Sequence, residues 1–151
     1  MIQLVPELIY RLRSVGPLRQ TDGSPTGVRQ YWQMSDAELE GPRIRARAPY
    51  PGGDWMRVGP DGFGRPDVRV QFVTDDEEVV LLHYTGLVLA TDAFNRAAES
   101  SGTTDFADQT MRMSLSFETG ATKYAWLNQH LFIAEGRLNQ GLVEYQVYRV
   151  T

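Results

Sequence analysis

Apolar and polar residues alternate along most of the chain, as they do in β-strands that bury one face. Residues 111–118 are typical, because Met111, Met113, Leu115 and Phe117 alternate there with arginine, serine and glutamate. Clusters of glycine, proline and aspartate separate the alternating segments and predict turns. The predicted strands span residues 8–13, 28–34, 43–48, 55–59, 68–73, 79–89, 111–118, 131–133 and 142–148.

A single segment has the pattern of a helix. Residues 93–99 contain good helix formers, and Thr91 or Asp92 could cap their N-terminus. Gly86 interrupts the longest predicted strand, which indicates either a β-bulge or the close approach of a neighbouring backbone. Many short strands and one short helix predict an antiparallel all-β protein, with one domain over residues 1–151.

The second face of several predicted strands is semi-polar, because it carries Gln30, Gln71, Ser114, Ser116 and Gln146. A sheet of this kind can close into a barrel, which removes its exposed edges and can enclose a small ligand. We therefore expect an antiparallel β-barrel with a semi-polar lumen, similar to calycins and lipocalins in general architecture. A sandwich of two sheets is the alternative.

The composition argues against several classes of protein. The chain has no cysteine, which removes disulfides and thiolate metal sites and fits a cytoplasmic location. We expect no signal peptide, because residues 1–10 lack a basic region followed by a long apolar run. We expect no membrane partner, because no apolar segment approaches the ~18 residues of a membrane span. The net charge of −4 argues against nucleic acid as a partner. The arginine-rich residues 43–48 predict either a solvated outer face or an anion-binding patch.

Several turn and corner motifs follow one another in a specific order. They are Gly41-Pro42, residues 51–55 (PGGDW), 61–62 (DG), 67–69 (DVR), 74–76 (TDD), 117–120 (FETG) and 124–128 (YAWLN). In order and spacing these motifs resemble the family known as domain of unknown function 3237, and the resemblance covers nearly the whole chain. It implies a compact β-barrel that self-associates, as a dimer or otherwise, and that has no established general activity.

Recognised catalytic motifs are absent from the sequence. His83 and His130 are the only histidines, and no carboxylate lies at a metal-binding spacing from either. No glycine-rich loop joins a strand to a helix, and no serine occupies a nucleophile elbow. The sequence therefore predicts neither a metal site nor a bound cofactor.

The remaining candidates for chemistry are polar residues on strand faces and turns, namely Glu118, Arg112, Arg69, Asp54 and His83. If their strand faces line the barrel, either arginine could hold an oxyanion. Glu118, Asp54 or His83 could then transfer a proton. The alternatives are outer-face ion pairs for Arg69, Arg112 and Glu118, a turn hydrogen bond for Asp54, and a core or interface position for His83.

Candidates for ligand binding are four aromatic residues and one asparagine, namely Trp55, Tyr124, Trp126, Asn128 and Trp32. Tryptophan and tyrosine present a large apolar surface with one polar atom, so they can stack on a ligand or fill the core. Asn128 could orient a ligand carbonyl group or hold the corner together by structural hydrogen bonds.

Three functions are compatible with these features. The first is a cofactor-independent enzyme of the isomerase, lyase or cyclase type. It would act by general acid–base catalysis on a small apolar, aromatic or polyketide-like substrate inside the barrel. The second is a carrier or sensor of the same ligands. The third is a homo-oligomeric structural protein whose barrel is filled by its own side chains. We favour the enzyme.

Overall fold

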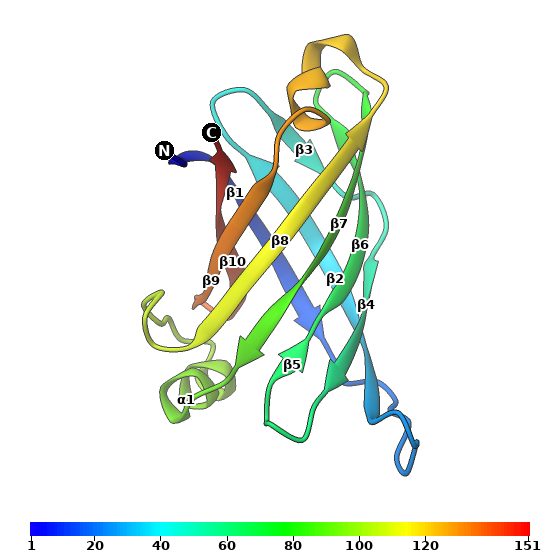
Figure 1. The fold of residues 1–151 in the computed structure, drawn as a ribbon, viewed down its shortest axis with the longest axis vertical. Helices are drawn as coiled ribbons and strands as arrows, with labels where there is room; N and C mark the ends of the chain where they lie inside the picture. Colours follow the sequence, from blue (N-terminus) through cyan, green and yellow to red (C-terminus); the bar gives the residue numbers. More distant parts are fainter.

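Ten antiparallel strands form a continuous sheet in the computed structural model, which describes residues 1–151 (Figure 1). The strands are β1 (Leu4–Val15), β2 (Val28–Glu40), β3 (Arg45–Arg47), β4 (Gly52–Val58), β5 (Gly64–Arg65), β6 (Asp67–Thr74), β7 (Val79–Leu89), β8 (Thr110–Thr119), β9 (Phe132–Asn139) and β10 (Leu142–Val150). An α-helix, α1 (Asp92–Ser100), and a 3₁₀-helix, η1 (Thr122–Leu127), lie at opposite ends of the molecule.

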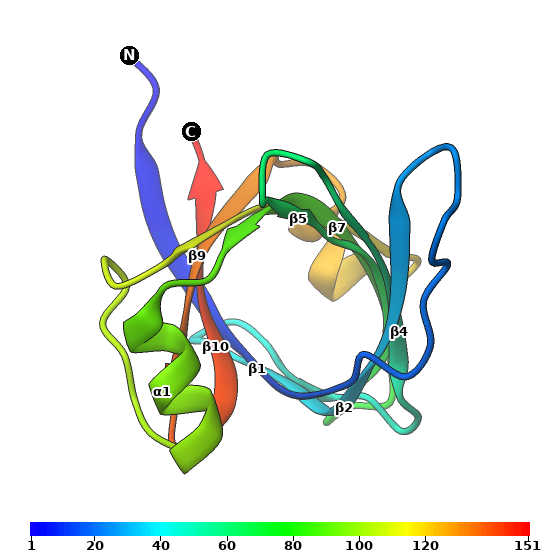
Figure 2. The same ribbon diagram turned by 90° about the horizontal axis from the view of Figure 1, so that it is seen from below.

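The sheet closes on itself into a barrel. β1 pairs with β10 on one side and with β2 on the other, and β6 pairs with β3, β4 and β7. A view from below shows the resulting ring of strands (Figure 2). These pairings confirm the predicted antiparallel barrel, and they rule out the alternative of two separate sheets.

The single predicted α-helix is confirmed. Thr91 caps it, because its hydroxyl oxygen accepts a hydrogen bond from the backbone N–H of Phe94 at 3.3 Å. Asp92 is the first helical residue, where a negative charge is favourable beside the positive end of the helix dipole. Neither helix has the length and hydrophobicity of a membrane-spanning helix.

The inner face of the barrel is hydrophobic. Val68, Val70 and Phe72 of β6 are buried, whereas the alternating residues Arg69 and Gln71 are exposed. The buried hydrophobic residues of the barrel form one core cluster of 27 residues. Each large apolar side chain in such a cluster contributes roughly 1.5–3 kcal/mol when it leaves water.

The prediction of a semi-polar lumen that brings charged groups together is therefore wrong. Arg69, Arg112 and Glu118 are all exposed on the outer face, as their alternative interpretation proposed, but none of them forms the ion pair that it predicted. The physical reason is that the opposite face of β8 carries large apolar side chains, which gain more from burial than arginine or glutamate can. The charged groups consequently point away from the core.

Gly86 marks a close backbone approach, as one of its two interpretations predicted. A Cβ atom at this position would collide with the carbonyl oxygen of Arg112 and would lie 2.9 Å from the Cα atom of Met113.

We expect Gly86→Ala to lower the free energy of unfolding by about 1–3 kcal/mol, because the backbone of β8 must move. Urea denaturation measures the loss. Gly120→Ala is the control, because no atom lies within 4 Å of its added Cβ. Equal stability of the two variants would contradict the close approach.

Candidate functional site

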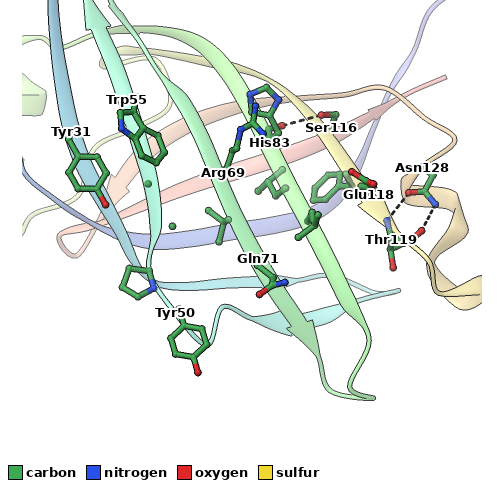
Figure 3. A pocket seen from close by; sticks show the side chains of 17 residues that line it. Tyr31, Tyr50, Trp55, Arg69, Gln71, His83, Ser116, Glu118, Thr119 and Asn128 are labelled. Atoms are coloured by element: carbon green, nitrogen blue, oxygen red, sulfur yellow. Dashed lines mark hydrogen bonds between the residues drawn. The ribbon is translucent and has the colours of Figure 1, made fainter.

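A broad concavity lies on the outside of the barrel, and we call it the outer groove (Figure 3). Its volume is about 920 Å³, and it crosses strands β4, β6, β7 and β8. It is lined by Tyr31, Tyr50, Pro51, Gly52, Gly53, Trp55, Arg69, Val70, Gln71, Leu81, Leu82, His83, Ser116, Phe117, Glu118, Thr119 and Asn128. Because the barrel interior is filled by the core, this groove replaces the expected internal cavity as the candidate site.

Glycine makes room for the groove at its aromatic end. Gly53 lies on the outer face of β4, directly opposite Arg69 of β6. A Cβ atom on Gly53 would lie 2.7 Å from the ring of Trp55 and 3.1 Å from the ring of Tyr31. These two rings have centroids 5.2 Å apart and form one wall. Trp55 is 47% exposed, so its ring is available to stack on a ligand.

Polar side chains form a row next to this aromatic wall. Cross-strand pairing places Arg69 opposite His83, and His83 opposite Ser116. Glu118 lies two residues further along β8, on the side of the groove away from Trp55 (Figure 3). Neither Arg69 nor Glu118 has a hydrogen-bond or ion-pair partner within the protein, so both charged groups are free to meet a ligand.

His83 is held by Asp67, a carboxylate that is not among the predicted site residues. Its Nε2 atom lies 2.9 Å from Oδ1 of Asp67, and both side chains are about half exposed. The second ring nitrogen, Nδ1, has no partner within the protein. Asp67 begins β6 and shares the outer face of that strand with Arg69, so the period-two pattern of β6 was the signal that could have identified it.

Asp54 supports this pair from inside the barrel. Its Oδ1 atom accepts a hydrogen bond from the backbone N–H of Asp67 at 3.0 Å, which is a strand amide and not the predicted turn amide. Asp54 is only 7% exposed, and burial raises the pKa of its carboxyl group to about 6, against the lowering effect of that hydrogen bond. Asp54 therefore lies behind the groove and does not line it.

Three tyrosines occupy the interior near Asp54. The hydroxyl groups of Tyr10 and Tyr84 are 3.4 Å apart, and the rings of Tyr10 and Tyr145 stack with centroids 5.7 Å apart. Burial raises the pKa of all three hydroxyl groups, and the nearby charge of Asp54 adds to the rise. These groups stay neutral at ordinary pH and belong to the core.

Four other predicted site residues lie away from the outer groove. Arg112 projects from another part of the outer face and donates a hydrogen bond to the carbonyl oxygen of Met111 at 3.0 Å. Trp32 packs against the core and donates from Nε1 to Oε1 of Gln30 at 3.1 Å. Tyr124 and Trp126 belong to η1, which covers one end of the barrel.

The two aromatic residues of η1 hold that helix in place. The hydroxyl group of Tyr124 donates to Oδ1 of Asp76 at 2.6 Å, and the Arg43 guanidinium lies 3.7 Å from the ring centroid of Trp126. Asn128 lines the groove, but its side chain accepts from the N–H of Thr119 at 2.9 Å and donates to the carbonyl oxygen of Thr119 at 2.8 Å. The structural alternatives therefore hold for all three residues, since Tyr124 belongs to the core cluster, Trp126 packs against it, and Asn128 holds the corner by hydrogen bonds.

The predicted residues that do gather at the groove are Trp55, Arg69, His83, Glu118 and Asn128. Together they offer a flat apolar surface, a free guanidinium group, an oriented imidazole and a free carboxylate. No group of three histidine, aspartate or glutamate side chains is arranged to hold a metal ion. The arrangement is suited to binding a small planar molecule and to moving a proton on it.

Comparisons with known proteins are consistent in fold and in family. The model of the family described as protein of unknown function (DUF3237) matches residues 6–150. A protein of Rhodopseudomonas palustris (strain TIE-1), called UPF0311 protein, is 26% identical over 136 residues, which cover 90% of this chain and 89% of that protein.

Two solved structures have the same fold. A β-barrel-like protein from Acinetobacter baumannii AYE has a TM-score of 0.81 and 24% identity, and the match covers 100% of this chain and 97% of that one. A protein from Penicillium herquei, described as an enzyme, has a TM-score of 0.68 and 18% identity, with 100% and 94% of the two chains covered. At these identities, the likeness shows the shared barrel alone.

Proposed function

The chain belongs to DUF3237, a family of unknown function, and we propose that it is a cofactor-independent enzyme that works by general acid–base catalysis in the outer groove. The observation that carries this proposal is the His83–Asp67 pair, which lies beside a free arginine and an aromatic wall. The expected substrate is a small, planar, apolar or aromatic molecule that contains a carbonyl group.

His83 is the proposed base. A neutral histidine that donates its Nε2 proton to Asp67 has an unprotonated Nδ1 atom, whose lone pair can accept a proton. Asp67 fixes this tautomer, and it stabilises the positive charge that develops on the ring. The hydrogen bond from the backbone of Asp67 to Asp54 keeps the start of β6 in position. Asp67 and Asp54 are therefore positioning residues.

Arg69 is the proposed stabiliser of the negative charge that forms on the substrate. When a C–H bond next to a carbonyl group breaks, the proton passes to His83 and the electron pair moves onto the carbonyl oxygen. Arg69 lies directly opposite His83 on the neighbouring strand, and its guanidinium group has no partner in the protein. A charged hydrogen bond to the developing oxyanion lowers the barrier for this step.

The size and lining of the groove support a small planar substrate. Its volume of about 920 Å³ falls within the roughly 300–1,000 Å³ of ordinary ligand sites. Trp55, Tyr31 and Leu81 supply apolar surface on which a ring can lie. Glu118 is placed to exchange a second proton, which would complete an isomerisation, an elimination or a cyclisation.

Deuterium exchange tests this function without knowledge of the natural substrate. The protein is incubated in D₂O with cyclohexanone, acetophenone and 1-tetralone, and mass spectrometry measures deuterium incorporated next to the carbonyl group. We expect the aryl ketones to exchange faster than in buffer, with 1-tetralone fastest because it covers most of the aromatic wall. Exchange at the buffer rate for every ketone that binds would refute the catalytic function.

Gly53 provides a test of the binding surface. We expect Gly53→Val to weaken 1-tetralone binding about tenfold, or ~1.4 kcal/mol, because the new side chain displaces the Trp55 ring. Titration calorimetry measures the affinity, and a melting curve checks that the fold is retained. Gly120→Ala, outside the groove, serves as the control and keeps the original affinity. If Gly53→Val binds as tightly as the unmodified protein, the ligand does not lie against this wall.

A carrier is the second candidate, and one observation favours it. The side chains of His83 and Asp67 remain 42% and 47% exposed, so water reaches both groups. Electrostatic catalysis is strongest where water is excluded. A carrier would bind aryl ketones in the groove and release them without deuterium incorporation, so the exchange experiment distinguishes the two functions. Self-association, which the family resemblance implies, stays a prediction.

A further inference from the structure

Three arginines lie side by side on the outer face of the barrel, next to the outer groove. Arg29 of β2 is directly opposite Arg57 of β4, and Arg57 is directly opposite Arg65 of β5. We call this set the arginine row. Like charges placed directly opposite one another on neighbouring strands are destabilising. The chain has more acidic than basic residues, 19 against 15, so its composition alone does not favour such a row.

The positive charge of the row is only partly compensated within the protein. Arg65 forms a double hydrogen bond with Asp61, at 2.7 and 3.1 Å. Arg29 donates from one guanidinium nitrogen to the carbonyl oxygen of Trp55 at 3.0 Å, which is a neutral partner. Arg57, in the middle, has no hydrogen-bond or ion-pair partner. The protein thus keeps an unpaired guanidinium group between two others.

A separate pocket of about 520 Å³ opens onto the row. All three arginines line it, and β7 contributes Thr85 and Gly86 to the opposite side. The Thr85 hydroxyl group has no hydrogen-bond partner within the protein, so it can also donate to a ligand. Guanidinium groups present paired N–H donors that match the oxygens of a phosphate group.

We propose that the arginine row is a binding site for the phosphate or diphosphate group of a small organic ligand. A doubly charged phosphate group compensates the repulsion among the arginines better than a singly charged carboxylate does. The pocket adjoins the outer groove, because Asp67 lines the pocket and pairs with His83 in the groove. The organic part of a bound ligand can therefore extend across Asp67 towards Trp55. This site does not depend on the proposed catalysis.

Calorimetric titrations test the site with three probes: inorganic pyrophosphate, phenyl phosphate and vesicles that contain phosphatidic acid. Benzoate is the singly charged comparison. We expect pyrophosphate and phenyl phosphate to bind, benzoate to bind at least about tenfold more weakly, and affinity to fall as salt is raised. Binding of the vesicles but of neither soluble phosphate would replace a small ligand by a lipid surface. Equal affinity for benzoate and phenyl phosphate would overturn the phosphate site.

Arg57→Gln is the decisive variant, because Arg57 makes no contact that the fold requires. We expect it to weaken phenyl phosphate binding about tenfold or more, and to melt no lower than the unmodified protein when phosphate is absent. Arg47→Gln is the matched control, since Arg47 is also an exposed outer-face arginine without an ion pair. Unchanged phosphate affinity in Arg57→Gln would overturn the proposal.

Ketone exchange in Arg57→Gln should remain normal, so failure of this site and failure of the catalytic groove can be told apart.

Discussion

Replacing His83 with glutamine is expected to reduce deuterium exchange of 1-tetralone by about 100-fold or more, the ordinary contribution of a positioned general base. Glutamine can keep a hydrogen bond to Asp67, but its amide group has no lone pair basic enough to take a proton from carbon. Binding of 1-tetralone should change little, because Trp55 and Tyr31 supply most of the contact area. The exchange rate and the calorimetric affinity are measured on the same preparation.

His130→Gln provides the matched control for this substitution. His130 is the only other histidine, and its Nδ1 atom is bonded to the carbonyl oxygen of Trp126 at 2.8 Å, outside the groove. We expect the control to exchange deuterium at the normal rate. If both variants retain full activity while binding stays intact, His83 is not the base. If Arg69→Gln also retains full activity, the proposed stabilisation of the oxyanion is wrong as well.

The second prediction with a large expected effect concerns the buried carboxyl group of Asp54 and the pH dependence of stability. Burial raises the pKa of this group from 3.8 to about 6 in the folded protein. Between those values the folded state binds more protons than the unfolded state, so stability falls as the pH rises from about 4 to about 6. Above pH 6 the ionised carboxylate lowers the free energy of unfolding by roughly 3 kcal/mol, since each pH unit corresponds to ~1.4 kcal/mol.

Asp54→Asn is therefore expected to stabilise the protein at pH 7 by up to about 3 kcal/mol and to change stability little at pH 4. Asparagine can still accept the hydrogen bond from the backbone of Asp67, so the support of β6 is kept. Urea midpoints at pH 4, 5, 6 and 7 measure the difference between the two proteins. Asp75→Asn, at an exposed turn, is the control. A difference that is the same at every pH would contradict the raised pKa.

The barrel could be predicted because the alternation of residues is strong in most strands. In β8 every second residue from Met111 to Phe117 is large and apolar, and the structure buries all of them. The same pattern should have placed Arg112 and Glu118 outside. The expectation of a semi-polar lumen was wrong because the more apolar face of a strand turns towards the core.

The site could be predicted only in part, because it depends on which residues lie opposite one another on different strands. Arg69, His83 and Ser116 come from three strands, and their row exists only in the register that the closed barrel imposes. No spacing within the sequence reveals that register. The groove itself depends on Gly53, whose missing side chain leaves space beside the Trp55 ring.

The positions of Tyr124 and Trp126, which lie outside the groove, show a second limit of prediction from sequence. Tyr124 and Trp126 form a corner in the sequence, as the residues of a ligand wall could. In the structure their partners come from other parts of the chain, namely Asp76 between β6 and β7, and Arg43 between β2 and β3. Local periodicity does not encode contacts between residues so far apart in sequence. Sequence patterns alone therefore could not show whether these two aromatic residues cover one end of the barrel or bind a ligand.

A crystal structure of the protein with bound 1-tetralone tests the central claim most directly. We expect the ligand ring to lie against Trp55 in the outer groove, with its carbonyl oxygen on Arg69 and the carbon next to the carbonyl facing Nδ1 of His83. A ligand bound inside the barrel, beside Asp54 and Tyr145, would contradict the account.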